Sequence, residues 1–340
     1  MLGIRLPKYI PSVSGTRGEQ TLKYQGINYP DGSVKYQASS HFSAHANVKL
    51  ELNETFNTFL YTADKEKLEL YDPTTTLQKR MVEDNPRTAL LKKLIDLFVA
   101  ETKTTPEVFG LDASMLVHMD KEGSDIDLVV YGKDNAQKIR DFWSKLPPQN
   151  KFGLRKPTDE RETIVSRRRG YSPLMTEDEI IEWESRKVSG YFEGTKFSVM
   201  PVDPQARYTC EYVSTGQFAA VRVVLKKSEI VCDPGVLDLD LNEIDIIYGP
   251  QNIKINQFVT FLPSRMGIFL NAGDVLFILG KIYAMKVSGS LIGYALTQFP
   301  WDDRSYLGES HYVAKIEKVD LRSMIPALLG MEFDNRYFTD

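Results

Sequence analysis

Three patterns of hydrophobic and polar residues succeed one another along the chain. Residues 15 to 75 alternate short β-prone runs with turn residues, as in TLKYQGINY, then Pro30-Asp31-Gly32, then SVKYQAS, which is typical of hairpins. After residue 208, runs such as DVLFILGKIYAMKV alternate with glycine or proline turns, and helical periodicity disappears. Helices and strands alternate between these two regions. The chain is therefore predicted to be α+β, with a mixed sheet and helices between a small N-terminal β unit and a C-terminal β-barrel-like domain.

The helices of the middle region are predicted from their capping residues and from apolar positions three or four residues apart. Asn85 can cap a helix that begins at Pro86. The apolar residues on one face of this helix are Leu90, Leu91, Leu94, Ile95 and Phe98. A second amphipathic helix is expected over residues 134–145, and Thr176 with Glu179 forms a capping box for a third.

These patterns divide the chain into four segments. We expect an N-terminal β-rich unit over 1–82, a mixed α/β domain over 83–207, a β-barrel-like domain over 208–330 and a tail over 331–340.

Composition and charge narrow the classes of function. Lys and Arg number 42 and Asp and Glu 46, so the net charge of −4 gives no global attraction to a polyanion, and any nucleic-acid site must be a local patch. The spacing of Cys210 and Cys232 matches neither a redox pair nor a zinc site, which predicts buried thiols. The most apolar stretch, 266–285, is interrupted by polar residues, and the N-terminus lacks the apolar core of a secretory signal. We expect no membrane span and a cytoplasmic location.

The candidate chemistry lies in the run Ser124-Asp125-Ile126-Asp127-Leu128. The period of two in a strand puts Asp125 and Asp127 on one face, about 7 Å apart at their Cα atoms, while Ile126 and Leu128 point into the core. Two carboxylates at this separation can bind divalent cations, and two ions about 3.5 to 4 Å apart can bridge a triphosphate and an attacking hydroxyl. Magnesium is the expected ion because it prefers carboxylates together with phosphate oxygens. The alternative is a surface strand end whose carboxylates cap the following turn.

The segment just upstream favours the catalytic interpretation. Asp112-Ala113-Ser114 is expected where a strand turns into a helix, and unpaired N–H groups at a helix N-terminus favour a phosphate. Ser114 adds a hydroxyl donor. The methyl group of Ala113 can obstruct the approach of backbone to phosphate.

With these residues in view, the segment FGLDASMLVHMDKEGSDIDLVVYG resembles the signature of the DNA polymerase beta type nucleotidyltransferase superfamily: a Gly-Ser turn, a short helix and then SDIDL. The chain departs from it by having Ala113 where the pattern has Gly. Together with the Pro-Asp-Gly hairpin, an arginine-rich middle and GDVLFILGK, the chain is similar to an archaeal family of predicted nucleotidyltransferases. The resemblance implies a nucleotidyltransferase fold over 83–207, and transfer of a nucleoside monophosphate from a nucleoside triphosphate to an unidentified hydroxyl acceptor, with RNA among the options.

The resemblance also implies a third carboxylate from a later strand, completing a two-ion magnesium site with Asp125 and Asp127. The first candidate is Asp203, after KFSVMPV, and Glu193 is the second, since Ser198 and Met200 are poor ligands for magnesium. If neither carboxylate reaches the ions, the domain binds nucleotide or RNA without transferring anything.

Further contacts to the triphosphate are expected from neighbouring and basic residues. The residues expected to contact it are Ala113, Ser114, Ser124, Arg167 and Arg168. Guanidinium groups pair well with phosphate oxygens, although the run Arg167-Arg168-Arg169 can equally be a solvated loop. Aromatic residues of the C-terminal strands either stack on bases or form the core, and the ones considered are Phe258, Phe261, Phe269, Phe277 and Tyr283.

Overall fold

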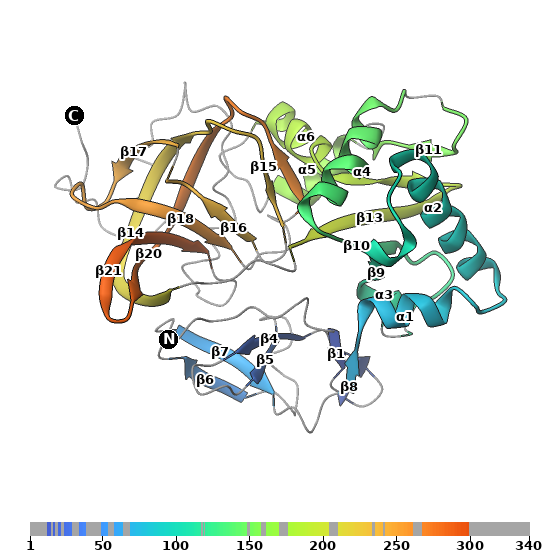
Figure 1. Ribbon diagram of the computed structural model, residues 1–340, viewed down its shortest axis with the longest axis horizontal. Coiled ribbons are helices and arrows are strands. Elements are labelled where there is room, and N and C mark those ends of the chain that lie inside the picture. The colour runs from blue at the N-terminus through green and yellow to red at the C-terminus, as the bar shows by residue number, and fades with distance from the viewer. Residues whose placement is uncertain are drawn as a thin grey trace.

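A computed structural model describes most of the chain between residues 71 and 298. The described ranges are 71–116, 118, 120–147, 150–157, 161–169, 176–203, 210–232, 235–240, 242–260 and 267–298; before residue 71 only strand backbone is described. The chain is a mixed α/β protein with several sheets and few helices (Figure 1).

The middle of the chain forms a five-stranded sheet in the order β11-β12-β13-β10-β9. Its strands are β9 Phe109–Leu111, β10 Ile126–Tyr131, β11 Leu154–Arg155, β12 Val188–Phe192 and β13 Thr195–Val202. Strands β10 and β13 pair in parallel, whereas the other neighbouring pairs are antiparallel. The expected strands over SDIDLVVYG and KFSVMPV are thus neighbours in one sheet.

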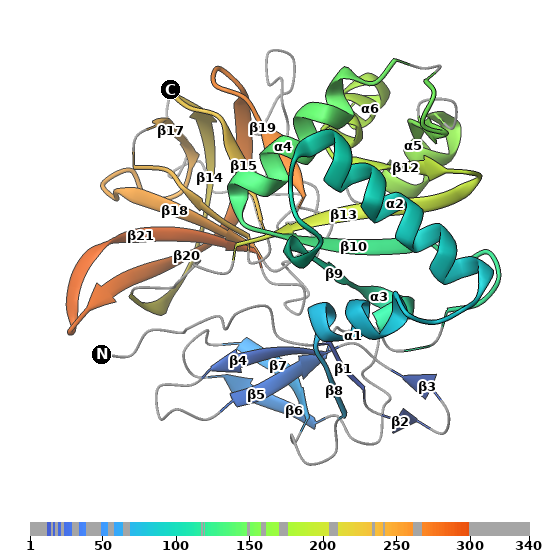
Figure 2. The same ribbon diagram turned by 45° about the vertical axis from the view of Figure 1, so that its right-hand side comes forward.

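Two helices cover one face of this sheet, α2 Pro86–Thr102 and α4 Lys133–Lys145 (Figure 2). The Asn85 side chain caps α2 by accepting hydrogen bonds from the N–H groups of Arg87 and Thr88, and Pro86 stands at its first position, as predicted. Phe197 of β13 packs edge-on against Phe98 of α2 and Trp143 of α4. Because Ile126 and Leu128 join the same core, the aspartates between and before them project from the opposite face.

Shorter helical segments connect these elements. They are α1 Pro73–Arg80, the 3-10 helix η3 Pro106–Val108, α3 Ala113–Leu116, α5 Arg161–Arg169 and α6 Glu177–Ser185. The predicted capping box of Thr176 and Glu179 is present at α6. Helix α1 lies within the segment 1–82 that was predicted to be β-rich, and α5 replaces the expected connection around the arginine run. Helix α1 forms because Asp72 caps it and Leu77 is buried; α5 forms because Val165 packs into a core.

The N-terminal strands form separate small sheets. They are β1 Ser12–Ser14, β2 Thr16–Arg17, β3 Gln20–Thr21, β4 Tyr24–Asn28, β5 Val34–Ala38, β6 Lys49–Asn53, β7 Thr58–Ala63 and β8 Glu69–Tyr71. Strands β4 and β5, on either side of Pro30-Asp31-Gly32 in the sequence, pair antiparallel as predicted; the turn itself lies outside the described residues. Sheet β4-β5-β7-β6 is four-stranded, and the pairs β1–β8 and β2–β3 stand apart from it.

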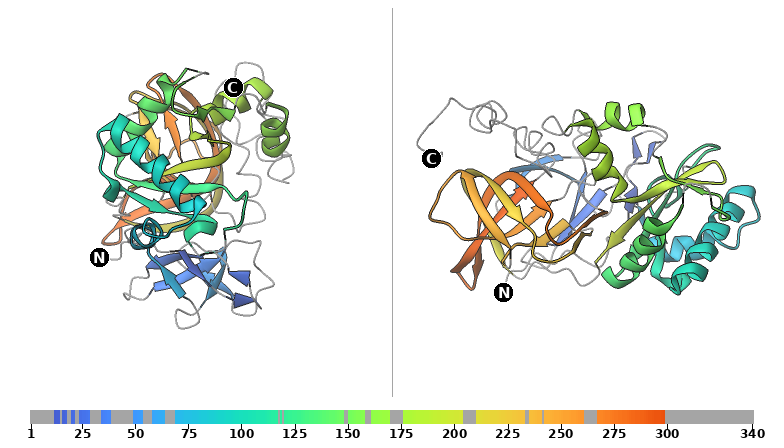
Figure 3. Two further views of the ribbon diagram at one scale, coloured as in Figure 1. Left: turned by 90° about the vertical axis from the view of Figure 1, so that its right-hand side faces the viewer. Right: turned by 90° about the horizontal axis from the view of Figure 1, so that it is seen from above.

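The C-terminal region is almost entirely β. Its strands are β14 Glu211–Val224, β15 Glu229–Val231, β16 Gly235–Asp238, β17 Glu243–Tyr248, β18 Ile255–Thr260, β19 Ile268–Leu270, β20 Val275–Val287 and β21 Ser290–Gln298. Six of them form a curved sheet in the order β16-β18-β21-β20-β14-β17, which lies at the end of the molecule away from α2 (Figure 3). Within the residues that the structure describes, the end strands β16 and β17 do not pair with each other. The sheet is therefore curved, as in the predicted barrel-like domain, but it is not closed into a barrel.

The two-stranded ribbon of β15 and β19 links the central and C-terminal cores. Ile230 and Phe269 join the core under α2 and α4, whereas their neighbours Val231, Ile268 and Leu270 join the core of the six-stranded sheet. Helices α5 and α6 also pack on the C-terminal core, through Val165, Ile180 and Trp183. Packing therefore does not divide at residue 207, where the sequence pattern changes. Among the described residues, no helix is long and apolar enough to span a membrane.

Gly190 of β12 sits where a larger residue cannot fit, and this gives a test of the packing. A Cβ atom at 190 would overlap the carbonyl oxygen of Arg155 and lie 2.7 Å from Trp143 Cη2. We predict that Gly190→Ala lowers the free energy of unfolding by about 1–3 kcal/mol, as overpacked sites do, measured by urea denaturation. The matched control is Ser189→Ala on the other face of the same strand, which should change it by less than about 0.5 kcal/mol. Equal effects of the two substitutions would contradict this packing.

Candidate functional site

The two aspartates of SDIDL lie on the face of the sheet opposite α2 and α4, at a partly exposed end that we call the open face; farther along the same face Val129 is buried. The Asp125 side chain is 40% exposed, and Asp127 is half-buried. Ser198 is the β13 residue directly beside Asp127, and its hydroxyl donates a hydrogen bond of 2.6 Å to Asp127 Oδ1. Lys196 lies two residues earlier on the same face, and its Nζ is 2.7 Å from Asp125 Oδ2. The open face thus holds two carboxylates, each with one polar partner from β13.

The register of β10 and β13 separates Asp203 from this pair. Asp127 stands beside Ser198 and Tyr131 beside Val202, so Asp203 lies five residues (203 minus 198) beyond the neighbour of Asp127. At about 3.3 Å per residue this is on the order of 16 Å along the strand. There Asp203 pairs with Lys133, whose Nζ is 3.6 Å from Asp203 Oδ2. The expectation that Asp203 shares metal ions with Asp125 and Asp127 does not agree with this register.

The second candidate for the third carboxylate is also directed elsewhere. Glu193 lies in the turn between β12 and β13 and forms an ion pair of 3.2 Å with Lys93 of α2. In the described part of the chain no three His, Cys, Asp or Glu side chains come close enough together to hold a metal ion. The residues present therefore do not fit a two-ion centre held by three carboxylates.

The segment upstream of β10 takes an unusual backbone conformation. The Asp112 N–H donates to the carbonyl oxygen of Asp127, so the turn after β9 is fastened to the aspartate strand. Ala113 then has a φ of 50°, in the left-handed region that favours glycine. This explains why glycine suits this position in the pattern that the segment resembles, and it makes Ala113 a strained residue of the turn. Ser114 follows in α3, whose single turn of four residues contributes little helix dipole for a phosphate.

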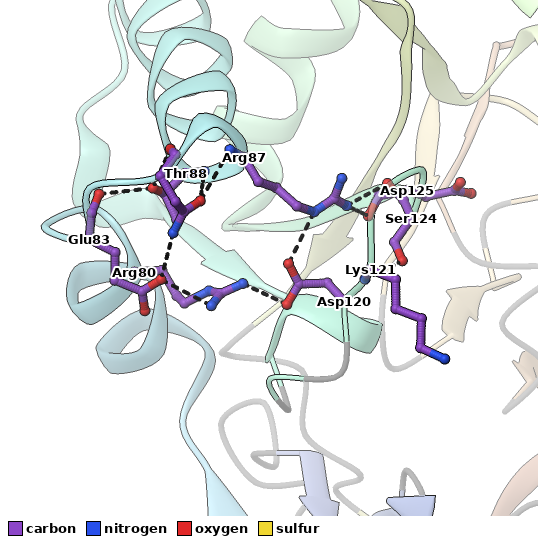
Figure 4. A network of polar contacts seen from close by, with 9 residues as sticks. Arg80, Glu83, Arg87, Thr88, Asp120, Lys121, Ser124 and Asp125 are labelled. Atoms are coloured by element: carbon purple, nitrogen blue, oxygen red, sulfur yellow. Dashed lines mark hydrogen bonds and ion pairs between the residues drawn. The ribbon is translucent and has the colours of Figure 1, made fainter.

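A buried network of ion pairs holds the loop that leads into β10 (Figure 4). Asp120 accepts hydrogen bonds from Arg80 Nη2 at 2.6 Å and from Arg87 Nε at 3.1 Å. Arg87 also donates to the backbone carbonyls of Ser124 and Asp125, the latter at 2.8 Å. Arg80 of α1 and Arg87 of α2 therefore hold the loop just before Asp125 and Asp127 in place. Sequence patterns did not reveal this role of Arg80, Arg87 and Asp120, because it depends on contacts between residues 33 to 40 positions apart.

Other predicted site residues have structural roles or lie outside the described part. The Ser124 hydroxyl accepts a hydrogen bond of 2.9 Å from the N–H of Lys121, so it closes the loop before β10. Arg167 and Arg168 belong to helix α5, and their side chains are outside the described residues. Phosphate contact by these two arginines therefore stays a prediction.

The aromatic residues of the C-terminal strands form the core. The rings of Phe258, Phe269, Phe277 and Tyr283 are all no more than 3% exposed, so they are not available to stack on bases; Phe261 lies outside the described residues. Burial raises the pKa of the Tyr283 phenol to about 12. The predicted buried thiols are confirmed: Cys210 and Cys232 are buried and are not joined in a disulfide, and burial raises the pKa of Cys210.

Comparisons with known proteins give a local similarity. A segment of 92 residues is 30% identical to an uncharacterised protein of the archaeon Methanocaldococcus jannaschii. This segment covers 27% of the chain and 26% of that protein, so the chain matches about a quarter of its relative's length. No family model and no solved structure matches the chain.

The network around Asp120 predicts a large effect of a single substitution. Its carboxylate is only 8% exposed and Arg80 and Arg87 are 11% and 17% exposed, so Asp120→Asn removes the counter-charge of Arg87 and one of the two carboxylate partners of Arg80, whose other partner is Glu83. We predict a loss of about 3 kcal/mol in the free energy of unfolding, measured by urea denaturation. Asp178→Asn is the matched control, since its ion pair with Arg161 has the same 2.6 Å length but Asp178 is 89% exposed. That change should cost less than about 1 kcal/mol. A cost for Asp120→Asn no larger than the control's would show that the network does not hold the loop.

Proposed function

We propose that this chain is a magnesium-dependent nucleotidyltransferase that moves a nucleoside monophosphate from a nucleoside triphosphate to a hydroxyl acceptor. The observation that carries the proposal is the placement of Asp127 in β10 and of Asp125 just before it on one face of the sheet, where Ser198 and Lys196 of β13 contact their carboxylates. The sequence around them is similar to the nucleotidyltransferase signature, which adds support from the residues themselves. The acceptor is unidentified; RNA is one option that the resemblance brings with it.

The geometry suits the magnesium complex of a triphosphate. Carboxylates about 7 Å apart at their Cα atoms, on a strand fixed by pairing on both sides, can hold one ion without a change of backbone. Magnesium keeps several waters and takes phosphate oxygens as its remaining ligands, so two carboxylates are enough to seat a nucleotide-bound ion. The ion supplies charge stabilisation at the phosphates. Asp125 and Asp127 orient the ion. The loop before β10, which Arg87 and Asp120 hold, keeps both side chains at the same end of the strand.

A second candidate function is the binding of nucleotide or RNA without transfer. The specific observation in its favour is that Lys196 and Ser198 stand on β13 beside the two aspartates, where a third carboxylate would complete a two-ion site. In this case the sheet face retains the triphosphate and no pyrophosphate is released.

Substitution of the aspartates tests the proposal. We predict that Asp125→Asn and Asp127→Asn each weaken magnesium-dependent binding of nucleoside triphosphate by about 10-fold to 100-fold, because each removes a charged ligand. Each substitution alone should also abolish pyrophosphate release. Binding is measured by calorimetry with each of the four ribonucleoside triphosphates. Transfer is measured as release of labelled pyrophosphate in the presence of pooled RNA.

Asp203→Asn is the control that the strand register provides. Because Asp203 lies at the far end of β13, this change should leave nucleotide affinity within about twofold of the unaltered protein. Binding that survives both Asp125→Asn and Asp127→Asn would refute the proposed site. Binding that needs both aspartates without any pyrophosphate release would favour the second candidate.

A further inference from the structure

Lys196 occupies a position that deepens the proposed function. Along β13, the next residue on the same face is Ser198, which stands beside Asp127. On the neighbouring strand β12, the residue paired with Lys196 is Tyr191. Its ammonium group pairs with Asp125 at 2.7 Å, and both side chains are about two-fifths exposed, at 38% and 40%. The lysine backbone is therefore held by its pairing with Tyr191 of β12, while its ammonium group remains partly accessible to solvent.

We infer that the ammonium group of Lys196 takes the place of a second divalent cation, so that this site works with a single magnesium ion. The inference rests on the proposed function. It names the cation that would lie next to the attacking hydroxyl, at a position where the described residues provide no third carboxylate.

Charge balance supports one ion rather than two. Asp125 and Asp127 contribute −2 and Lys196 contributes +1, which leaves −1 on the protein side of the site. A site with a carboxylate in place of Lys196 would carry −3. A second ion of charge +2 next to the ammonium group would meet a like charge within a few ångströms, which is unfavourable unless a further anion separates them.

The geometry allows the lysine to reach reacting groups. A lysine ammonium group has three donors on a flexible stem, and one of them is used by Asp125. The ammonium group can therefore keep its bond to Asp125 and also donate to an acceptor oxygen or to the α-phosphate of a nucleotide whose metal ion is seated on Asp127 and Asp125.

Transfer of the nucleoside monophosphate then needs no reactant besides the triphosphate and the acceptor hydroxyl. The acceptor hydroxyl oxygen forms a bond to the α-phosphorus, and the bond from that phosphorus to the bridging oxygen breaks, with its electron pair leaving on pyrophosphate. The hydroxyl proton passes to the Asp125 carboxylate and then to water. Lys196 stays protonated throughout and stabilises the negative charge that develops on the attacking oxygen.

Counting metal ions tests the inference directly. The protein is saturated with the non-hydrolysable analogue α,β-methylene-ATP, and the Mn²⁺ bound per chain is measured by equilibrium dialysis with electron paramagnetic resonance. We expect one ion in the unaltered protein and in Lys196→Met. We expect two in Lys196→Asp, which puts a third carboxylate next to Asp125. Two ions in the unaltered protein, or one ion in Lys196→Asp, would overturn the inference.

A rate measurement gives the second test. Lys196→Met should slow pyrophosphate release by about 100-fold or more while changing the affinity for the analogue only a few-fold, because the ammonium group acts mainly in the transition state. Lys196→Arg should restore part of the rate, since it keeps the charge. Lys133→Met is the control, because it breaks the similar ion pair with Asp203 at the other end of the same strands and should change neither value.

The outcomes separate the inference from the proposed function. If the unaltered protein binds neither the analogue nor Mn²⁺, the proposed function fails and the inference fails with it. If it binds and transfers nucleotide but holds two ions, or if Lys196→Met transfers at the normal rate, only the inference fails. Melting temperatures of all variants, compared with that of the unaltered protein, exclude loss of the fold as the cause of a slower rate.

Discussion

The parallel pairing of β10 with β13 is the constraint on which the rest of the site depends. Pairing in this register puts Ser198 beside Asp127 and Lys196 beside Asp125, and it puts Asp203 at the opposite end. A shift of one residue would turn every side chain of β13 to the other face, placing Phe197 among the carboxylates and Lys196 in the core. The packing of Phe197 between Phe98 and Trp143 therefore fixes the chemistry of the uncovered face as well as the stability of the covered one.

Two further features hold the aspartates in place from outside the sheet. Arg87 bonds to the backbone just before β10, and Asp120 ties Arg87 to Arg80, so α1 and α2 act together on one loop. Between the two cores, the ribbon of β15 and β19 contributes alternate side chains to the core under α2 and α4 and to the core of the six-stranded sheet. The C-terminal sheet thus supports the central domain through packing, and its buried aromatic residues serve that packing rather than a base-stacking surface.

Local sequence signals predicted much of the fold, and long-range contacts decided what they missed. Asn85 and Pro86 predicted α2, Thr176 and Glu179 predicted α6, and Pro-Asp-Gly predicted the pairing of β4 with β5. These predictions succeeded because capping and turn chemistry act over a few residues. Helix α1, PTTTLQKR, has weak intrinsic propensity and depends on the Asp72 cap and on Arg80 bonding to Asp120 forty positions away. The two aspartates were recognisable from their spacing. Lys196 was not, since its pairing with Asp125 spans 71 positions and requires the register of β13.

The central claim is that Asp125 and Asp127 seat a metal–nucleotide complex on the uncovered face of β10 with Lys196 as the neighbouring cation. The most direct measurement is a crystal structure of the protein soaked with Mn²⁺ and α,β-methylene-ATP, with the ions located by anomalous scattering. The account predicts one anomalous peak touching both carboxylates and the triphosphate, with Lys196 Nζ within hydrogen-bonding distance of the α-phosphate or of Asp125. A nucleotide bound at any other surface, or an uninterrupted Lys196–Asp125 ion pair with no metal ion beside it, would contradict the account.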